Sequence, residues 1–252
     1  MLLKKILKNC TEPVIITIMS TLPSGSHQAA KLDMNWFNTF SSDEIITQKV
    51  WDEYIRTALR DVKEALSEIG ITNIKIILKA HLSIGFAFGF IFREVTGFSL
   101  NILQRDQWWL NDETLSNTSC FSTNMVPNDI KSTNLCLDIS INKNVEDAMN
   151  LFVKNNGINF RAIIRSAPLQ NDYSSIVIDS AAAVSIVKNI MSEINNILSK
   201  CIITDIYIFA AIPLGLAYMI GAKLNACGRI HLYEFDKNKR EYLKSWTIDG
   251  ND

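Results

Sequence analysis

The sequence has no excess of basic side chains. Its 252 residues contain 25 Lys and Arg against 26 Asp and Glu, and its pI is about 6.3. Binding to the backbone of long DNA or RNA needs a basic surface, so the composition does not favour a long nucleic acid as partner. A small anion remains a candidate ligand, because helix N-termini and backbone N–H groups hold phosphate without net positive charge.

Motifs of common enzymes are also absent. The chain has no Gly-x-Gly-x-x-Gly, Walker loop, nucleophile elbow or His-Glu-x-x-His, and no paired carboxylates follow its expected strands. With three histidines, His27, His81 and His231, a histidine-rich metal site is not expected. His81 and Ser83 could form a catalytic pair, but no third group that would orient them can be identified. We therefore expect no enzymatic activity, no metal and no other cofactor.

Neither disulfides nor a membrane span are indicated. The five cysteines are odd in number and lack metal-ligand spacing, which indicates free buried thiols in a reducing cytoplasm. Residues 82–92 are apolar but too short to cross a bilayer, for which a helix needs about 20 apolar residues. Pro213 interrupts the second apolar stretch, residues 206–222. A buried strand followed by a buried helix explains both stretches better. The N-terminal Met-Leu-Leu-Lys-Lys is too poor in apolar residues for a signal peptide.

What the chain does contain is an internal repeat. Residues 74–89 align with residues 204–219 at a constant offset of 130, which places Gly85 on Gly215. The register continues without a gap, so that the expected strand beginning at Ser99 falls on the one beginning at Arg229. Buried strand–helix pairs share composition, so chance similarity is the alternative to duplication.

The segments that flank the repeat agree with a duplication. Apolar residues recur at helical spacing in residues 50–66 and again in residues 181–198. Each half also opens with a β-rich run, at residues 14–19 and 135–141. The order in each half is strand, variable segment, long helix, strand, helix, strand. We therefore predict an α/β fold of two tandem Rossmann-type units with mainly parallel sheets, related by a pseudo-two-fold axis.

The predicted division follows composition. Residues 111–134 are rich in Asn, Ser and Thr, contain Pro127-Asn128 and are expected to form a connecting loop. This gives a first half over residues 1–110 and a second half over residues 135–252.

The candidate ligand-binding residues follow the expected strands. Ligands of open α/β sheets bind at the carboxyl ends of the strands. Ser83 suits an N-cap and Pro213 the first position of a helix, and two helix N-termini facing one pocket would suit a ligand with several phosphates. The twelve candidates are Ser20, Thr21, Leu22, His81, Leu82, Ser83, Trp108, Trp109, Arg165, Ser166, Pro213 and Leu214.

Several of these candidates also have a purely structural interpretation. His81 could be satisfied by a nearby backbone group instead of contacting a ligand. Trp108 and Trp109 could stack on a base or pack in the core. Arg165 could bind phosphate or pair with a carboxylate.

The two strand–helix segments resemble the SAVED domain. The resemblance lies in Ala-His-Leu-Ser at residues 80–83, the glycine-rich helix that follows, and Trp108-Trp109, and in Pro-Leu-Gly-Leu-Ala-Tyr at residues 213–218. It covers about residues 14–246 and implies two fused CARF-like units. His81, Leu82 and Ser83 would line the pocket in the first half, and Pro213 and Leu214 in the second.

The resemblance also implies a function in bacterial anti-phage signalling, in CBASS or type III CRISPR systems. Such domains bind a cyclic oligonucleotide, often a cyclic trinucleotide or tetranucleotide, and commonly associate head to tail on binding, which activates an effector. Family members are usually fused to a nuclease, TIR, protease or membrane module. The roughly 13 residues before the first strand leave no room for one, since a domain usually needs about 50. We therefore expect a separate effector subunit or an isolated sensor portion.

Two other functions stay open at this point. One is an enzyme that degrades the nucleotide signal, in the manner of a ring nuclease. The other is a structural subunit that scaffolds an effector.

Overall fold

Two mostly parallel sheets with interleaved helices form the molecule. The computed structural model describes residues 2–8, 10–21, 29–37, 47–93, 96–110, 120–170, 172–173, 178–225 and 227–249. The first sheet has five strands in the order β2-β1-β3-β4-β5, and the second has six in the order β11-β10-β9-β7-β8-β6. The outer strands β5, β6 and β11 run antiparallel to their neighbours. The strands are β1 (Val14–Met19), β2 (Leu32–Asn35), β3 (Asn73–Lys79), β4 (Ser99–Gln104), β5 (Gln107–Leu110), β6 (Phe121–Pro127), β7 (Asn134–Ser140), β8 (Ala162–Pro168), β9 (Asp205–Ala211), β10 (Arg229–Asp236) and β11 (Glu241–Ile248).

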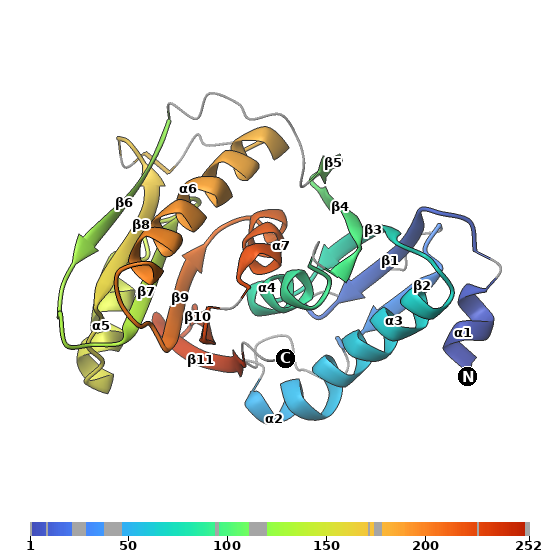
Figure 1. Cartoon of the computed structure of the whole chain (residues 1–252), viewed down its shortest axis with the longest axis horizontal. Coiled ribbons are helices and arrows are strands. Elements are labelled where there is room, and N and C mark those ends of the chain that lie inside the picture. Colours follow the sequence, from blue (N-terminus) through green and yellow to red (C-terminus); the bar gives the residue numbers. More distant parts are fainter. Residues whose placement is uncertain are drawn as a thin grey trace.

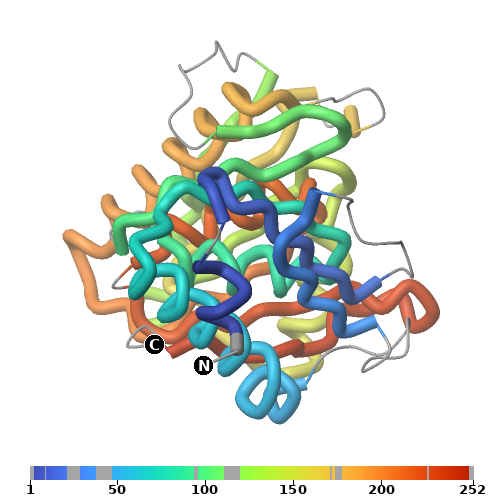
Figure 2. Tube along the Cα trace, turned by 90° about the vertical axis from the view of Figure 1, so that its right-hand side faces the viewer, coloured from blue at the N-terminus to red at the C-terminus, as the bar shows by residue number. Residues whose placement is uncertain are grey.

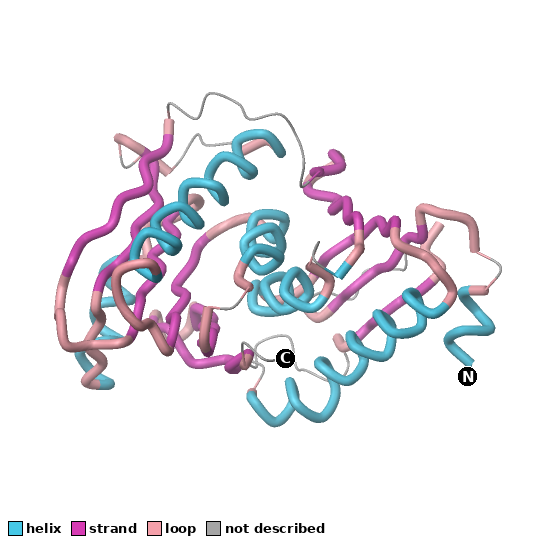
Figure 3. Tube along the Cα trace, viewed as in Figure 1, coloured by secondary structure: helices cyan, strands magenta, loops and turns pink. Residues whose placement is uncertain are grey.

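Helices fill the space between the sheets and cover their faces. Figures 1 and 3 show α4 and α7 crossing at the centre, with strands on either side. Figure 2 shows the N-terminal half in front and the second half behind it. One hydrophobic core joins both sheets with α3, α4, α6 and α7, and a smaller one lies under α5. The helices are α1 (Leu2–Leu7), α2 (Gln48–Val50), α3 (Arg56–Glu68), α4 (Leu82–Ile91), α5 (Glu146–Asn156), α6 (Ser180–Leu198) and α7 (Leu214–Lys223), and a π-helical turn, Trp51–Ile55, joins α2 to α3.

The sequence pattern of each helix matches its position. In α3 a stripe at helical spacing is buried, from Leu59 and Val62 to Leu66, while the other face is charged. Helix α6 begins at an N-cap, Asp179, whose side chain accepts a hydrogen bond of 2.7 Å from the Ala182 N–H. Helices α4 and α7 are buried almost all round, because each is enclosed by the other and by the sheets. In the part of the chain that the structure describes, no helix combines the length and the apolar character needed to cross a membrane.

The two units are equivalent, as predicted, but the gap-free register was wrong. Asn73 of β3 pairs with Ser99 of β4, and Asp205 of β9 pairs with Arg229 of β10. Segment β3–α4 therefore corresponds to β9–α7 at an offset of 132 residues, whereas β4 corresponds to β10 at 130. Seven residues separate α4 from β4, but five separate α7 from β10. The sequence concealed this difference because a shift by two residues keeps every strand side chain on the same face.

Helices α4 and α7 pack through glycines around the pseudo-two-fold axis. Gly89 and Gly221 are equivalent at the corrected offset. A Cβ at Gly89 would meet the backbone of Tyr218, and a Cβ at Gly221 would meet the backbone of Phe86, the residue equivalent to Tyr218. The same contact therefore occurs twice, as isologous packing requires. Only glycine permits this approach of two helix backbones.

Some predicted loops are strands. Residues 111–134 were expected to form a connecting loop, but Phe121–Pro127 form β6, which pairs with β8 along its whole length. Every side chain of β6 is half-buried or exposed, as in an edge strand, and its polar composition disguises the strand. Trp108 and Trp109 were expected to follow the strand that begins at Ser99, and they lie in a further strand, β5, which forms a hairpin with β4.

Candidate functional site

Each sheet has one switch point, where the chain leaves the carboxyl ends of two neighbouring strands in opposite directions. In the first sheet the chain passes outward from β1 to β2 on one side and from β3 to β4 on the other. In the second sheet the same divergence falls between β7 and β9. Such switch points leave a crevice beyond the strand ends, which is where open α/β sheets bind ligands.

At the first switch point Ser20 and His81 form a tight pair. Ser20 Oγ accepts the His81 backbone N–H at 2.9 Å and lies 2.9 Å from Nδ1 of the His81 ring. We assign the hydroxyl hydrogen to Nδ1, which leaves the ring proton on Nε2. Burial lowers the pKa of His81, while the nearby carboxyl of Glu234 acts in the opposite direction. Ser20 is fully buried and His81 half-buried, so His81 is the one of the two that can meet a ligand.

The start of α4 is occupied by a carboxylate from the other half. Glu234, near the end of β10, accepts hydrogen bonds from the Ser83 N–H at 2.7 Å and the Ser83 hydroxyl at 2.6 Å. Burial raises the pKa of Glu234, while His81 and these hydrogen bonds oppose the shift. Ser83 is not the N-cap that the sequence predicted, because α4 begins at Leu82 and His81 precedes it. Ser83 is 1% exposed, and its N–H is not open to a phosphate.

The start of α7 carries the equivalent contact in reverse. Gln104, at the end of β4, accepts a hydrogen bond of 2.9 Å from the Gly215 N–H through Oε1. Gln104 is equivalent to Glu234, and Gly215 to Ser83. Each half thus caps the central helix of the other half, and we call these two contacts the crossed caps.

The two helix starts lie side by side. A Cβ at Gly85 would come within 3.3 Å of both Ala217 and Leu214, so the first turns of α4 and α7 touch. The predicted residues on this rim are half-buried and form two equivalent pairs. In the corrected register, His81 matches Pro213 and Leu82 matches Leu214. The sequence predicted Pro213 as the first helical residue, but α7 begins at Leu214 and Pro213 is the residue before it.

The second switch point opens into a cavity of about 500 Å³. Small-molecule sites are commonly of this size. Lys143, Lys237 and Arg240 bring positive charge to it, and Asp147 brings one negative charge. The Lys143 ammonium lies 5.4 Å from the centre of the Phe235 ring. The lining comprises Lys143, Asn144, Val145, Asp147, Ala148, Ala210, Ala211, Phe235, Lys237, Arg240 and Tyr242.

Sequence reasoning missed this cationic cavity. The signal was the basic β10–β11 turn, residues 237–240, together with Lys143 in the loop after β7; both segments follow the carboxyl ends of strands. A second cavity of about 500 Å³ lies between α6 and α7, lined by Val184, Met191 and Lys223 among others. It lies along helix faces, away from the strand ends, so the cavity beyond β7 and β9 is the better candidate.

Arg165 and Ser166 lie inside β8, not after it. The Arg165 guanidinium bonds Asp138 through Nε at 2.7 Å and Glu146 through an Nη at 2.6 Å, which is the carboxylate pairing that stood as the alternative to phosphate. Asp138 is fully buried, and burial raises its pKa against the opposing effects of Ser140 and Arg165. Ser166 is also fully buried and lies 3.0 Å from the Thr123 hydroxyl. Neither residue lines the cavity beyond β7 and β9.

The remaining predicted residues divide in the same way. Trp109 is 2% exposed, and a Cβ added at Gly215 would lie 2.7 Å from its ring. Trp109 therefore packs in the core. Trp108 is half-buried, and the Lys75 ammonium lies 4.8 Å from the centre of its ring. Thr21 is half-buried at the first switch point and donates to the Lys79 carbonyl at 3.0 Å. Leu22 lies outside the described residues.

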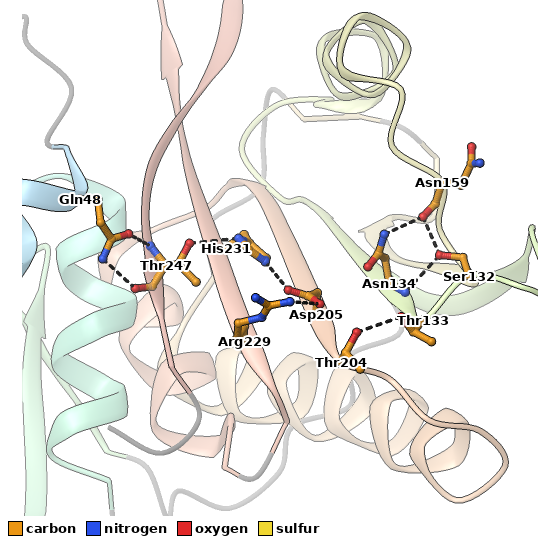
Figure 4. Close-up of polar contacts among 10 residues, drawn as sticks. All are labelled: Gln48, Ser132, Thr133, Asn134, Asn159, Thr204, Asp205, Arg229, His231 and Thr247. Carbon is orange, nitrogen blue, oxygen red and sulfur yellow. Dashed lines mark hydrogen bonds and ion pairs between the residues drawn. The ribbon is translucent and has the colours of Figure 1, made fainter.

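A polar cluster occupies the opposite edge of the second sheet (Figure 4). His231 Nε2 lies 2.6 Å from Asp205, and its Nδ1 lies 3.0 Å from the Thr247 hydroxyl. Gln48 accepts the Thr247 N–H at 2.7 Å through its side-chain oxygen, which ties α2 to β11. The cluster has the hydroxyl, imidazole and carboxylate of a catalytic triad. However, His231 is 8% exposed, and the cluster lies at the amino ends of the strands, so we interpret it as a tie between the halves.

Metal and thiol chemistry have little support here. Within the described ranges, no group of three or more His, Cys, Asp or Glu side chains could hold a metal ion. All five cysteines are free, as predicted, but Cys120 is exposed, and only Cys136 and Cys227 are buried. Burial raises the pKa of the Cys227 thiol to about 11, so at neutral pH it is not a nucleophile.

Comparison with solved structures identifies the same fold in bacterial receptors. The Acinetobacter baumannii Cap4 SAVED/CARF-domain receptor matches with a TM-score of 0.74 and 16% identity over 94% of this chain, both with 3'3'3'-cAAA and with 2'3'3'-cAAA. The Moraxella osloensis Cap4 receptor matches with a TM-score of 0.69 and 16% identity over 95% of this chain. The chain spans about half of each receptor, 52% and 50% respectively. No curated protein matches it by sequence.

The sequence itself matches a protein family across both halves. The match covers residues 55–248, which include both helix starts, both crossed caps and the cavity beyond β7 and β9. That family is the SMODS-associated and fused to various effectors sensor domain. The chain therefore belongs to the SAVED family of sensor domains, as its resemblance predicted.

Proposed function

We propose that this chain is a sensor that binds a cyclic oligonucleotide, of three or four nucleotides, at the carboxyl edge of its two sheets. The observation that carries the proposal is the SAVED match over residues 55–248, which include both helix starts, both crossed caps and the cavity beyond β7 and β9. The cyclic trinucleotides bound to the Acinetobacter baumannii receptor support the ligand class.

In this proposal the ligand lies across the rim formed by the two helix starts. His81 and Leu82 contact it from the first half, with Thr21, and Pro213 and Leu214 from the second. A phosphate of the ligand lies near Lys143 and the β10–β11 turn, because cationic side chains pair with phosphate. The Arg165 guanidinium is already paired with Asp138 and Glu146. His81 Nε2–H offers a donor to a base or a phosphate oxygen.

The proposal extends to assembly and domain structure. Residues 1–110 and 135–252 act as the two CARF-like halves of one SAVED domain in the cytoplasm, and β6 is part of the second half. Ligand binding drives head-to-tail association, which activates an effector, fused or separate, in anti-phage defence. The chain itself acts as a sensor without catalytic activity.

Calorimetric titration against a panel of cyclic di-, tri- and tetranucleotides tests the proposal. We expect one member to bind with a Kd of micromolar or below. Failure of every member to bind below about 100 μM, which corresponds to only about −5.5 kcal/mol, would contradict it. Light scattering with and without the binding nucleotide tests association, and assembly that ignores the nucleotide would favour a scaffold subunit.

The enzymatic alternative has one specific motivation. The Ser20–His81 pair lies at the proposed site, where an imidazole could transfer a proton. The buried Ser20 hydroxyl cannot reach a ligand. Incubation of the protein with 3'3'3'-cAAA followed by chromatography decides between the two: intact nucleotide supports the sensor, and a linear product supports a ring nuclease.

A further inference from the structure

The crossed caps are equivalent in position but not in charge. Glu234 places a carboxylate on the start of α4, and Gln104 places a neutral amide on the start of α7. The fold does not require this difference, because a carboxylate and an amide oxygen accept the same helix N–H. The carboxylate is therefore a property of this chain's site beyond what the packing of the halves needs.

The α4 cap is more completely engaged than the α7 cap. Glu234 accepts both the N–H and the hydroxyl of Ser83, and the Ser245 hydroxyl lies 3.4 Å from that same hydroxyl. Ser83 and Ser245 are 1% and 3% exposed, so water does not surround this contact. The Glu234 carboxylate is engaged by these hydrogen bonds, so it acts on a nearby ligand through its field. The field is felt at His81 and Leu82, which are half-buried on the rim next to Ser83.

We propose that Glu234 determines how the ligand is oriented, by keeping phosphate away from the α4 start and leaving that position to an uncharged base or ribose. The inference rests on the proposed function. The helix dipole would attract an anion to either helix start, but at α4 the negative charge of Glu234 opposes it. At α7 the neutral Gln104 leaves the attraction in place. The ligand's phosphates therefore lie toward Pro213, Leu214 and the cationic cavity, and Glu234 is a specificity-determining residue.

Two matched substitutions test this inference. Glu234→Gln makes both caps amides, and Gln104→Glu makes both carboxylates; each keeps the hydrogen bond to the helix. We expect E234Q to bind 3'3'3'-cAAA about threefold to tenfold more tightly at low salt, with less gain at high salt, because it removes one partly screened charge. We expect Q104E to bind more weakly by a similar factor. The double variant E234Q/Q104E, which exchanges the caps, should lie between the two.

The pH dependence of binding provides a second readout, by comparison of wild type with variants. The titratable groups facing Glu234 are His81, from the β3–α4 turn, and Tyr242, from β11. Because burial raises the pKa of Glu234 and lowers that of His81, each group takes up a proton as the pH falls, and both protonations should tighten binding, whereas Tyr242, whose pKa is raised by burial, stays neutral. The part due to Glu234 should persist in H81Q and disappear in E234Q.

The outcomes separate the two proposals. If wild type binds and E234Q binds equally or more weakly, Glu234 does not repel the ligand and the charge inference alone fails. If the affinity of wild type depends on pH in the same way as that of E234Q, the charge inference also fails. If neither protein binds 3'3'3'-cAAA, 2'3'3'-cAAA or any other cyclic nucleotide of the panel, the proposed function and this inference fall together.

Discussion

The substitution Gly89→Ala tests the central packing of the fold. On helix propensity alone, alanine should stabilise α4 by about 1 kcal/mol relative to glycine. The structure predicts the reverse. An added Cβ would overlap the Tyr218 carbonyl oxygen and lie 2.8 Å from the Ala222 nitrogen. Both atoms belong to the backbone of α7, which cannot move away as a flexible side chain could.

The size of the effect follows from this overlap. A carbon and a carbonyl oxygen approach to about 3.3 Å, so α4 and α7 must separate by roughly 1 Å near Gly89. A gap of that size forfeits a quarter to a half of the dispersion energy between the separated atoms. Overpacking typically costs about 1–3 kcal/mol, and a rigid backbone on both sides places Gly89 near the upper value. After the gain in helix propensity, we expect a net loss of about 2 kcal/mol in the free energy of unfolding.

Urea unfolding followed by circular dichroism measures this loss. The midpoint should fall while the m-value stays constant, and the Tm should drop by about 4–8 °C for a chain of this size. Gly85→Ala on the same helix is the matched control. Its Cβ would lie 3.3 Å from the Ala217 Cβ, a tight contact that a small shift relieves, so we expect a change near zero. If G89A were as stable as wild type, the backbone contact between the two helices would not exist in solution.

Three further predictions concern charge. Arg165→Gln should lower the free energy of unfolding by about 3 kcal/mol, because it leaves the buried Asp138 carboxyl without its cation. Nucleotide affinity measured by calorimetry should not change, and a comparable loss of binding free energy would indicate that Arg165 contacts the ligand. Burial lowers the pKa of His231 from 6.5, so the stability that the neutral ring contributes is complete above that pH and is lost as the pH falls through the folded pKa. Between pH 7 and 5 the Tm of His231→Gln should therefore fall less than that of wild type, and an equal fall in Tm would contradict this. The double variant K237A/R240A should weaken cyclic-nucleotide binding about tenfold and reduce its salt dependence, and an unchanged salt slope would place the phosphates elsewhere.

Sequence patterns predicted the elements whose periodicity is set by one buried face. The stripe in α3 and the apolar runs of β3 and β9 each report directly on burial, so their positions were correct. The edge strand β6 was missed, because its composition resembles that of a loop and its pairing with β8 is a long-range contact. Helix α5 was missed for a related reason, since Met149 is its one fully buried residue and most of its surface is polar.

The candidate site divided along a similar line. The turns at His81 and Pro213 could be predicted, because parallel strands place their carboxyl ends at one edge. The role of Glu234 could not, because it depends on a hydrogen bond between residues 151 positions apart. A signal was nevertheless present: Gln104 and Glu234 are equivalent polar residues at the ends of equivalent strands. Polar residues at matched positions of a duplication are therefore worth testing as contacts between the halves.

The crossed caps also explain why the proposed site requires both halves. A helix start leaves backbone N–H groups that need acceptors, and here the acceptor at Ser83 and the acceptor at Gly215 both come from the opposite half. Separating the halves would expose these N–H groups together with the glycine faces of α4 and α7. A ligand that lies across both helix starts contacts a surface that exists only while the halves are docked. In the proposed function, its binding energy would therefore stabilise that docking by mass action and link occupancy of the crevice to the relative position of the two sheets.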